Sequence, residues 1–295
     1  MEKQYVVGLG EILWDLLPEG KQLGGAPANF AYHVAQLGLD SKMVSAVGKD
    51  HLGDEIIQRL DGRGVDYVIE RLSFPTGVVN VKIDAQGIPD YQIKEQVAWD
   101  YILFNERLKS LAKHTRAVCF GTLAQRGEVS RKTILAFLDA MPSAENAYRI
   151  FDINLRQHYY TKQVIESSLR KCNILKINDD ELRIVAPLLG FAFLSLEESA
   201  QKIMYHYRLK MVVLTCGAEG SYVFTPDETS FFATPEVNVA DTVGAGDSFT
   251  AAFVSAVLSG KSIRQAHELA VRVAAYVCTQ AGAMPQLLNE FRDFL

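Results

Sequence analysis

The stretch 236–257, EVNVADTVGAGDSFTAAFVSAV, has the residue types and spacing that most clearly suggest chemistry. A polar turn from Asp241 to Asp247 precedes a run of small and apolar residues that predicts a buried helix. Gly244 and Gly246 let the backbone approach a ligand closely. The first amides of a helix are unpaired and its dipole is positive there, so the turn is a candidate site for phosphate.

Asp247 is unusual in such a turn, because a carboxylate repels a bound phosphate. One interpretation is an N-cap residue that accepts hydrogen bonds from the helix amides. The other is a general base that takes the proton of a substrate hydroxyl as that hydroxyl attacks a phosphoryl group. Helix physics alone leaves both interpretations open.

The segment Asp241–Phe249, DTVGAGDSF, resembles the C-terminal signature D-T-x-G-A-G-D-x-F of the PfkB, or ribokinase-like, carbohydrate kinases. This resemblance implies that Asp247 is the general base. It also implies that the amides of Gly244, Ala245 and Gly246 form an anion hole for the transferred phosphoryl group. The implied fold is a ribokinase-like three-layer α/β/α structure with a mostly parallel central sheet and a small β lid.

Composition excludes several other classes of protein. The 295 residues include 48% hydrophobic and 22% charged residues, as is usual for a globular protein. A formal net charge of −5 argues against nucleic acid as a main partner. The N-terminus does not resemble a signal peptide, and no apolar run is long enough for a membrane span. The four widely spaced cysteines do not suggest a metal site, and we expect a cytoplasmic protein with reduced thiols.

The order of elements predicts the sheet independently of the resemblance. Strands that alternate with helices imply a mostly parallel sheet covered on both faces. We expect a helix that ends at Leu37, a hairpin at 221–234, strands at 5–9, 43–48, 116–123, 149–156, 173–178 and 211–217, and helices at 51–63, 130–140, 161–171, 179–188, 196–207, 247–259 and 263–281.

Residues 65–100 have a different pattern. Apolar and polar residues alternate on either side of the turn Ala85–Gly87, which is a hairpin signal. We therefore predict one kinase domain, 1–295, whose β lid is formed mainly by about 12–24 and 65–100.

A second segment, GGAPANFAYHVAQLG, begins at Gly24 and resembles the N-terminal signature of the same family. The residues alone are also compatible with an ordinary helix entry that has proline in its first turn. The resemblance implies that Gly24, Gly25 and Asn29 hold the sugar, together with Asp15. A carboxylate and an amide can each make two hydrogen bonds to neighbouring hydroxyls.

The nucleotide site is implied by two further matches. Asn178 and Glu181 match the N-x-x-E motif that organises Mg²⁺ and its waters, although an acidic helix N-terminus would look the same. Thr215, Gly217 and Gly220 match T-x-G-x-x-G and would face the nucleotide, although many such glycines form only turns.

Charged groups at other strand ends complete the expected site. Arg126 lies in GTLAQR, which resembles a fructokinase segment, and would close over the acceptor. Arg156 would neutralise phosphate charge, or else form a structural salt bridge. The family often uses a monovalent cation such as K⁺, and by position its ligands would be Asp241, Val243, Val277, Gln280 and Gly282.

The resemblance implies a kinase that uses ATP and Mg²⁺ to phosphorylate a primary hydroxyl of a sugar. Fructose is the expected acceptor, because GEILWD, GGAPAN and GTLAQR are similar to segments of bacterial fructokinases. The alternatives are a related kinase for ribose, 2-keto-3-deoxygluconate or a nucleoside, and a non-catalytic sugar-binding regulator. The expected partners are a sugar and ATP, with no nucleic acid and no membrane. In relatives of this family the exposed edge of the lid often pairs with another subunit, so the resemblance also implies a homodimer formed through the lid.

Overall fold

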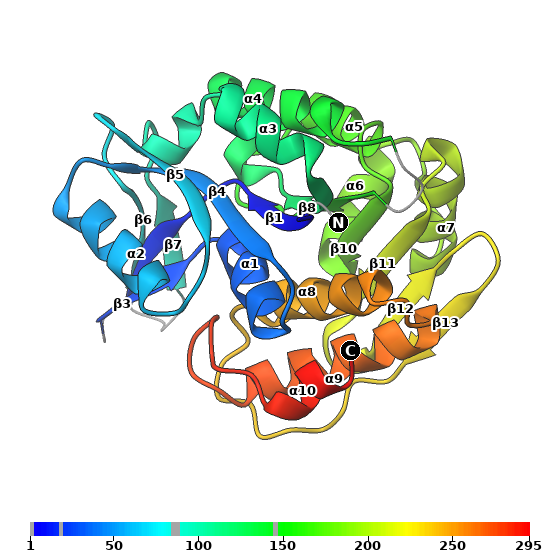
Figure 1. The fold of residues 1–295 in the computed structure, drawn as a ribbon. Coiled ribbons are helices and arrows are strands. Elements are labelled where there is room, and N and C mark those ends of the chain that lie inside the picture. Colours follow the sequence, from blue (N-terminus) through cyan, green and yellow to red (C-terminus); the bar gives the residue numbers. More distant parts are fainter. Residues whose placement is uncertain (1–2, 18–19, 84–88, 144–146) are drawn as a thin grey trace.

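The structure is a computed structural model that describes residues 3–17, 20–83, 89–143 and 147–295. Within these residues, nine strands form one sheet in the order β13-β12-β11-β10-β9-β8-β1-β4-β5 (Figure 1). The bounds are β1 Tyr5–Leu9, β4 Ser41–Gly48, β5 Tyr67–Leu72, β8 Thr115–Phe120, β9 Tyr148–Asp152, β10 Ile174–Asn178, β11 Met211–Thr215, β12 Ser221–Phe224 and β13 Thr229–Phe232.

The strands from β11 to β5 pair in parallel, whereas β12 and β13 add an antiparallel hairpin at one edge. Strands inside the sheet are buried on both faces, so their side chains alternate between two cores. Val6 of β1 packs with one core and Val7 with the other. The predicted mostly parallel sheet is therefore confirmed.

Helices cover both faces of this sheet (Figure 1). One face is covered by α3 Glu106–Lys113, α4 Glu128–Ala140, α5 Lys162–Leu169, α6 Asp179–Leu188 and α7 Leu196–Tyr207. The other is covered by α1 Ala26–Gln36, α2 His51–Asp61, α8 Ala245–Leu258, α9 Ile263–Cys278 and α10 Asn289–Asp293. Short 3₁₀ turns occur at η1 Ala98–Tyr101, η2 Leu123–Gln125 and η3 Gly217–Glu219.

A second sheet contains four strands among the described residues, in the order β3-β2-β6-β7. Its strands are β2 Leu13–Leu17, β3 Gly20–Gly24, β6 Gly77–Ile83 and β7 Pro89–Ile93. The antiparallel pairing of β6 with β7 matches the expected hairpin, and its turn at 85–87 lies outside the described residues. This sheet is smaller than the predicted lid range, because β5, within 65–100, pairs with β4 in the large sheet.

Most predicted elements lie within a few residues of the observed ones, and α6 and α7 have the predicted bounds. The helix at 106–113 was not predicted. None of the helices in the described ranges has the length and apolar character needed to cross a membrane. Because the parallel strands end at one edge of the sheet, the polar residues after β1, β8, β9, β10 and β11 converge there.

Candidate active site

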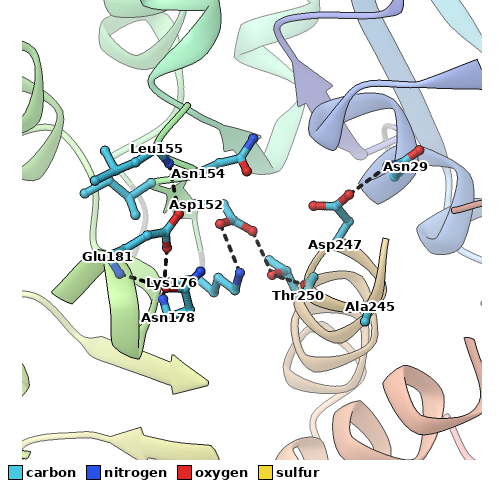
Figure 2. Close-up of polar contacts among 12 residues, drawn as sticks. Asn29, Asp152, Asn154, Leu155, Lys176, Asn178, Glu181, Ala245, Asp247 and Thr250 are labelled. Carbon is cyan, nitrogen blue, oxygen red and sulfur yellow. Dashed lines mark hydrogen bonds and ion pairs between the residues drawn. The ribbon is translucent and has the colours of Figure 1, made fainter. Parts of the chain in front are cut away.

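Asp247 and Asn29 lie 218 positions apart in the sequence and touch in the structure. Asn29 Nδ2 donates a hydrogen bond of 2.7 Å to Asp247 Oδ2 (Figure 2). Asn29 is buried, and its Oδ1 has no hydrogen-bond partner among the described residues. The packing of α1 against α8 therefore brings the predicted base next to a predicted sugar-binding amide.

The N-terminus of α8 excludes one of the two interpretations of Asp247. The helix begins at Ala245, two residues before the predicted start, and its N-cap is Gly244, which provides no capping side chain. Asp247 is the third residue of the helix and is not the N-cap. Burial raises the pKa of Asp247, while the hydrogen bond from Asn29 and the charge of Lys176 oppose this rise. A carboxylate with a raised pKa is better suited to accept a proton than an ordinary aspartate.

Gly244 has a structural reason to be glycine. Its φ of 79° lies in the left-handed region, and a Cβ on it would come within 2.7 Å of Ala283 Cα. The amide of Ala245 makes one long hydrogen bond of 3.3 Å to the carbonyl of Thr242. The first turn of α8 thus presents one weakly satisfied amide, that of Ala245, two residues before Asp247.

The other predicted sugar residues lie on and after the small sheet. Asp15 is on β2, and burial raises its pKa to about 6. A Cβ on Gly24 would lie 2.3 Å from Asp15 Oδ2, so only glycine leaves room for this carboxylate. Gly25, the N-cap of α1, has a φ of 110°, and a Cβ there would lie 2.4 Å from the carbonyl oxygen of Glu11. Gly24 therefore lets the end of β3 pack against Asp15, and Gly25 lets the start of α1 pack against the backbone at Glu11.

Glu11 was not singled out from the sequence. It follows β1, is 1% exposed, and its Oε2 has no partner among the described residues. Burial raises the pKa of Glu11 to about 7, against the opposing charges of Arg156 and Arg126. The charge of Asp247 also contributes to this rise, so the two carboxyl groups interact. The sequence signal was a lone acid at the end of a buried strand.

The structure places the two predicted arginines in different environments. The side chain of Arg126 is 8% exposed and makes two hydrogen bonds to Asp100, from Nε at 2.8 Å and from Nη2 at 3.0 Å. It stacks on Trp99, with 4.0 Å from Cζ to the ring centroid, and its Nη1 lacks a partner among the described residues. Arg156 is exposed and bonds only locally, to the carbonyl of Leu155, in the contacts described. Arg126 is therefore already in an ion pair, which limits how far it can move.

Asn178 and Glu181 form a capping box at the start of α6. Asn178 Oδ1 accepts from Glu181 N at 2.8 Å, and Glu181 Oε2 accepts from Asn178 N at 3.0 Å. Glu181 Oε1 also accepts from Leu155 N at 2.9 Å, so it links the loop after β9 to α6 (Figure 2). These oxygens retain lone pairs for water, which suits the hydration shell of Mg²⁺ better than direct ligation. The described residues contain no group of three or more His, Cys, Asp or Glu that would hold a metal ion by themselves.

Residues 19–289 match the profile of the pfkB family carbohydrate kinases. The chain belongs to the PfkB family. It is 27% identical to a protein named ATP-dependent 6-phosphofructokinase from Thermoanaerobacterium thermosaccharolyticum, over 97% of this chain and 92% of that protein. It is also 28% identical to a fructokinase from Escherichia coli, over 95% of this chain and 94% of that one.

A solved structure supports the same assignment. An uncharacterized sugar kinase from Pyrococcus horikoshii in complex with ATP is 25% identical, with a TM-score of 0.82 and 100% coverage of both chains. The present chain is thus an ATP-dependent carbohydrate kinase with the ribokinase-like fold that the sequence predicted.

The predicted nucleotide residues of this PfkB kinase lie beside the capping box. Asn178 and Thr215 are paired at the ends of β10 and β11. Gly217 and Gly220 have φ values of 52° and 137°, in the region that favours glycine. Thr234 Oγ1 donates to the carbonyl of Gly217 at 2.6 Å, so the loop that follows β13 borders this turn. Contact of these residues with nucleotide stays a prediction.

The structure brings together both segments that were predicted to hold a monovalent cation. Asp241 Oδ1 accepts from Val243 N at 3.0 Å, and Asp241 Oδ2 accepts from Gly282 N at 3.1 Å. The amide of Asp241 also donates to the carbonyl of Cys278, which lies between the predicted ligands Val277 and Gln280. Asp241 therefore ties the two segments together, and the cation site stays a prediction.

Proposed function

We propose that this PfkB kinase transfers the γ-phosphoryl group of ATP to a primary hydroxyl of a neutral hexose of the fructose type. The observation that carries the proposal is the contact of Asp247 with Asn29 beside the open first turn of α8. It combines a base, a hydroxyl-binding amide and an anion site within one region.

The reaction follows from these positions. Asp247 takes the proton of the hydroxyl, and the oxygen attacks the γ-phosphorus in line as the bond to the ADP oxygen breaks. The amides of residues 244–246 donate hydrogen bonds to the phosphoryl oxygens, where negative charge develops. Mg²⁺, when bound, would shield the phosphate charges, and Asn178 and Glu181 would hold its waters. The small sheet carries Asp15 and would exclude water from the acceptor side.

The polar groups around the base suit an acceptor rich in hydroxyls. Glu11 and Asn29 each have a buried oxygen without a partner among the described residues, and Arg126 has a buried N–H in the same state. Buried polar groups are normally hydrogen-bonded, and a polyhydroxylated ligand offers both donors and acceptors. Three carboxyl groups, those of Glu11, Asp15 and Asp247, would repel an acceptor whose negative charge lies deep in the site.

A phosphorylated acceptor is the second candidate. One relative is named a 6-phosphofructokinase, and Arg156 is an exposed cation whose charge opposes the rise in the pKa of Asp247. A guanidinium at the rim could bind a phosphate that stays outside the acidic interior. The two candidates therefore differ in whether the acceptor uses Arg156.

A competition assay with ATP separates these candidates. Fructose, fructose 6-phosphate, ribose, 2-keto-3-deoxygluconate and adenosine would be compared by kcat/KM. We expect fructose to lead, and Asp15→Asn to lower its kcat/KM by roughly 10–200-fold, since a lost hydrogen bond to a charged group costs about 1.5–3 kcal/mol. Asp40→Asn, an exposed carboxylate paired with Lys3, is the matched control and should leave kcat/KM unchanged.

Two results would contradict the proposal. If fructose 6-phosphate leads and Arg156→Ala abolishes that preference, the acceptor is a sugar phosphate. If none of the five compounds stimulates ATP consumption, the proposed acceptor class is wrong, even though the family assignment stands.

A further inference from the structure

Lys176 is a buried cation on the strand β10. The other residues of β10 before Asn178 are apolar, and Lys176 is 7% exposed. Its Nζ lies 3.3 Å from Asp152 Oδ1, and Asp152 is 4% exposed (Figure 2). The two residues are register partners on neighbouring parallel strands, and both side chains point to the face that α8 covers. A buried ion pair usually adds little to stability relative to apolar residues, so its presence suggests another role.

The pair lies directly under the first turn of α8. A Cβ on Gly246 would lie 2.8 Å from Lys176 Nζ, so no side chain fits between the ammonium and the backbone of the predicted anion hole. Thr250 Oγ1 lies 3.1 Å from Asp152 Oδ2 and 2.9 Å from the carbonyl oxygen of Gly246. Asp152 therefore holds Lys176 from one side while Thr250 links the same carboxylate to the helix (Figure 2).

Lys176 is one of several charged groups that affect the ionisation of Asp247. The charged groups that face Asp247 come from five elements: Lys176 on β10, Asp152 at the end of β9, Arg156 in the following loop, Glu181 on α6 and Glu11 after β1. The three acids oppose ionisation of Asp247, and the two cations favour it. Arg156 is exposed and screened by solvent, whereas Lys176 is not.

Lys176 keeps its positive charge in this setting. Burial by itself lowers the pKa of an ammonium, but the nearby carboxylates of Asp152, Glu181 and Asp247 outweigh burial and raise the pKa of Lys176. Any occupant of the anion site at the start of α8 therefore meets a fixed positive charge in addition to the helix dipole.

We propose that Lys176 is a positioning residue for phosphoryl transfer, which places a fixed positive charge under the first turn of α8. This positive charge stabilises the negative charge that develops on the phosphoryl group, and it keeps Asp247 ionised. The inference rests on the proposed function, because it assigns Lys176 to the same site.

The test uses two variants and one control. Lys176→Met removes the charge and keeps most of the volume. The double variant Asp152→Asn/Lys176→Met removes both charges, so it leaves no uncompensated carboxylate. Lys171→Met is the matched control, since Lys171 is exposed just after α5 and pairs with Asp139. Turnover, both KM values and the pH profile of kcat/KM would be measured for each variant.

We expect Lys176→Met to lower kcat by roughly 10–100-fold with little change in the sugar KM. The acid limb of kcat/KM should move upward by about one pH unit, because Asp247 then takes up a proton more readily. The double variant should behave similarly. Burial raises the pKa of Asp152, so Asp152 should take up a proton once the charge of Lys176 is lost in the single variant. The control should match the wild type.

Recovery of wild-type kcat and pH profile in the double variant would overturn the proposal. The charges of Lys176 and Asp152 would then only neutralise each other. A ¹³C NMR titration of labelled aspartate carboxyls, with Asp247 identified by its loss in Asp247→Asn, gives a readout that needs no substrate. If no sugar is phosphorylated but the Asp247 midpoint rises in the variants, the proposed acceptor fails and the inference stands. An unchanged midpoint in both variants would refute the inference, whichever acceptor is used.

Discussion

Replacing Glu11 by glutamine would remove a buried acid that the candidate active site holds at a cost in stability. Glu11 is 1% exposed, and burial raises its pKa from 4.5 to about 7. In the unfolded chain the same carboxyl is free to ionise near its ordinary pKa. The folded protein therefore loses stability as the pH rises from 4.5 through 7, because only the unfolded state ionises easily in that window.

The size of the effect follows from the shift. A difference of about 2.5 pKa units corresponds to about 3 kcal/mol in the free energy of unfolding when the pH is well above both values. At pH 5 most of this cost is absent, and less than about 1 kcal/mol remains. Glu11→Gln should therefore raise the free energy of unfolding by about 3 kcal/mol at pH 8 and by less than about 1 kcal/mol at pH 5.

Urea unfolding at the two pH values, followed by circular dichroism, measures this difference. Glu268→Gln, on the exposed side of α9, is the control and should change the free energy of unfolding by less than about 0.5 kcal/mol at both. Equal gains at pH 5 and pH 8 would show that packing, not ionisation, is responsible. A loss of stability at pH 8 would show that the Glu11 carboxylate is well satisfied in the folded protein.

Four further predictions follow from the site and the core. Asp247→Asn should preserve the fold and ATP binding but lower kcat by roughly 10²–10⁴-fold, and near-normal phosphorylation would remove Asp247 from the base role. Glu181→Ala should raise the Mg²⁺ concentration needed for half-maximal activity more than the sugar KM, and a change confined to the sugar KM would contradict its role near the metal. Potassium should give higher activity than sodium or a bulky organic cation, and equal rates in all three salts would argue against the predicted cation site. His267 lies between the hydroxyls of Ser221 and Ser230, and burial lowers its pKa from 6.5 to about 4, so its contribution to stability is present above pH 6.5 and lost as the pH falls toward 4. His267→Gln should therefore have a flatter dependence of unfolding free energy on pH between 7 and 4.5, and an unchanged slope would show that His267 does not titrate there.

The sequence determined the fold class and the family, because both depend on local patterns. Alternating apolar strands and amphipathic helices predict a covered parallel sheet wherever their exact ends lie. The segments 24–38 and 241–249 are contiguous signatures, so their residues could be recognised without knowing any contact. The structure retained these elements with bounds close to those predicted, and the profile match over 19–289 confirmed the family.

Tertiary structure decided which of the predicted residues meet and what charge state they favour. The contact of Asn29 with Asp247 depends on how α1 packs against α8, and no local pattern encodes a contact over 218 residues. Helix rules alone could not exclude Asp247 as an N-cap, because the choice depends on where α8 begins. The same limit explains why β5 was placed in the lid, since strand pairing partners are set by packing.

Glu11 and Lys176 show the limit most clearly. Each is a single charged residue in or beside an apolar strand, which the sequence displays but cannot interpret. Their significance comes from burial and from the neighbours that other strands and helices supply, Asp152 for Lys176 and Asp247 for both. Desolvation and Coulomb interactions depend on three-dimensional distance, so only the folded chain determines the pKa values that the chemistry requires.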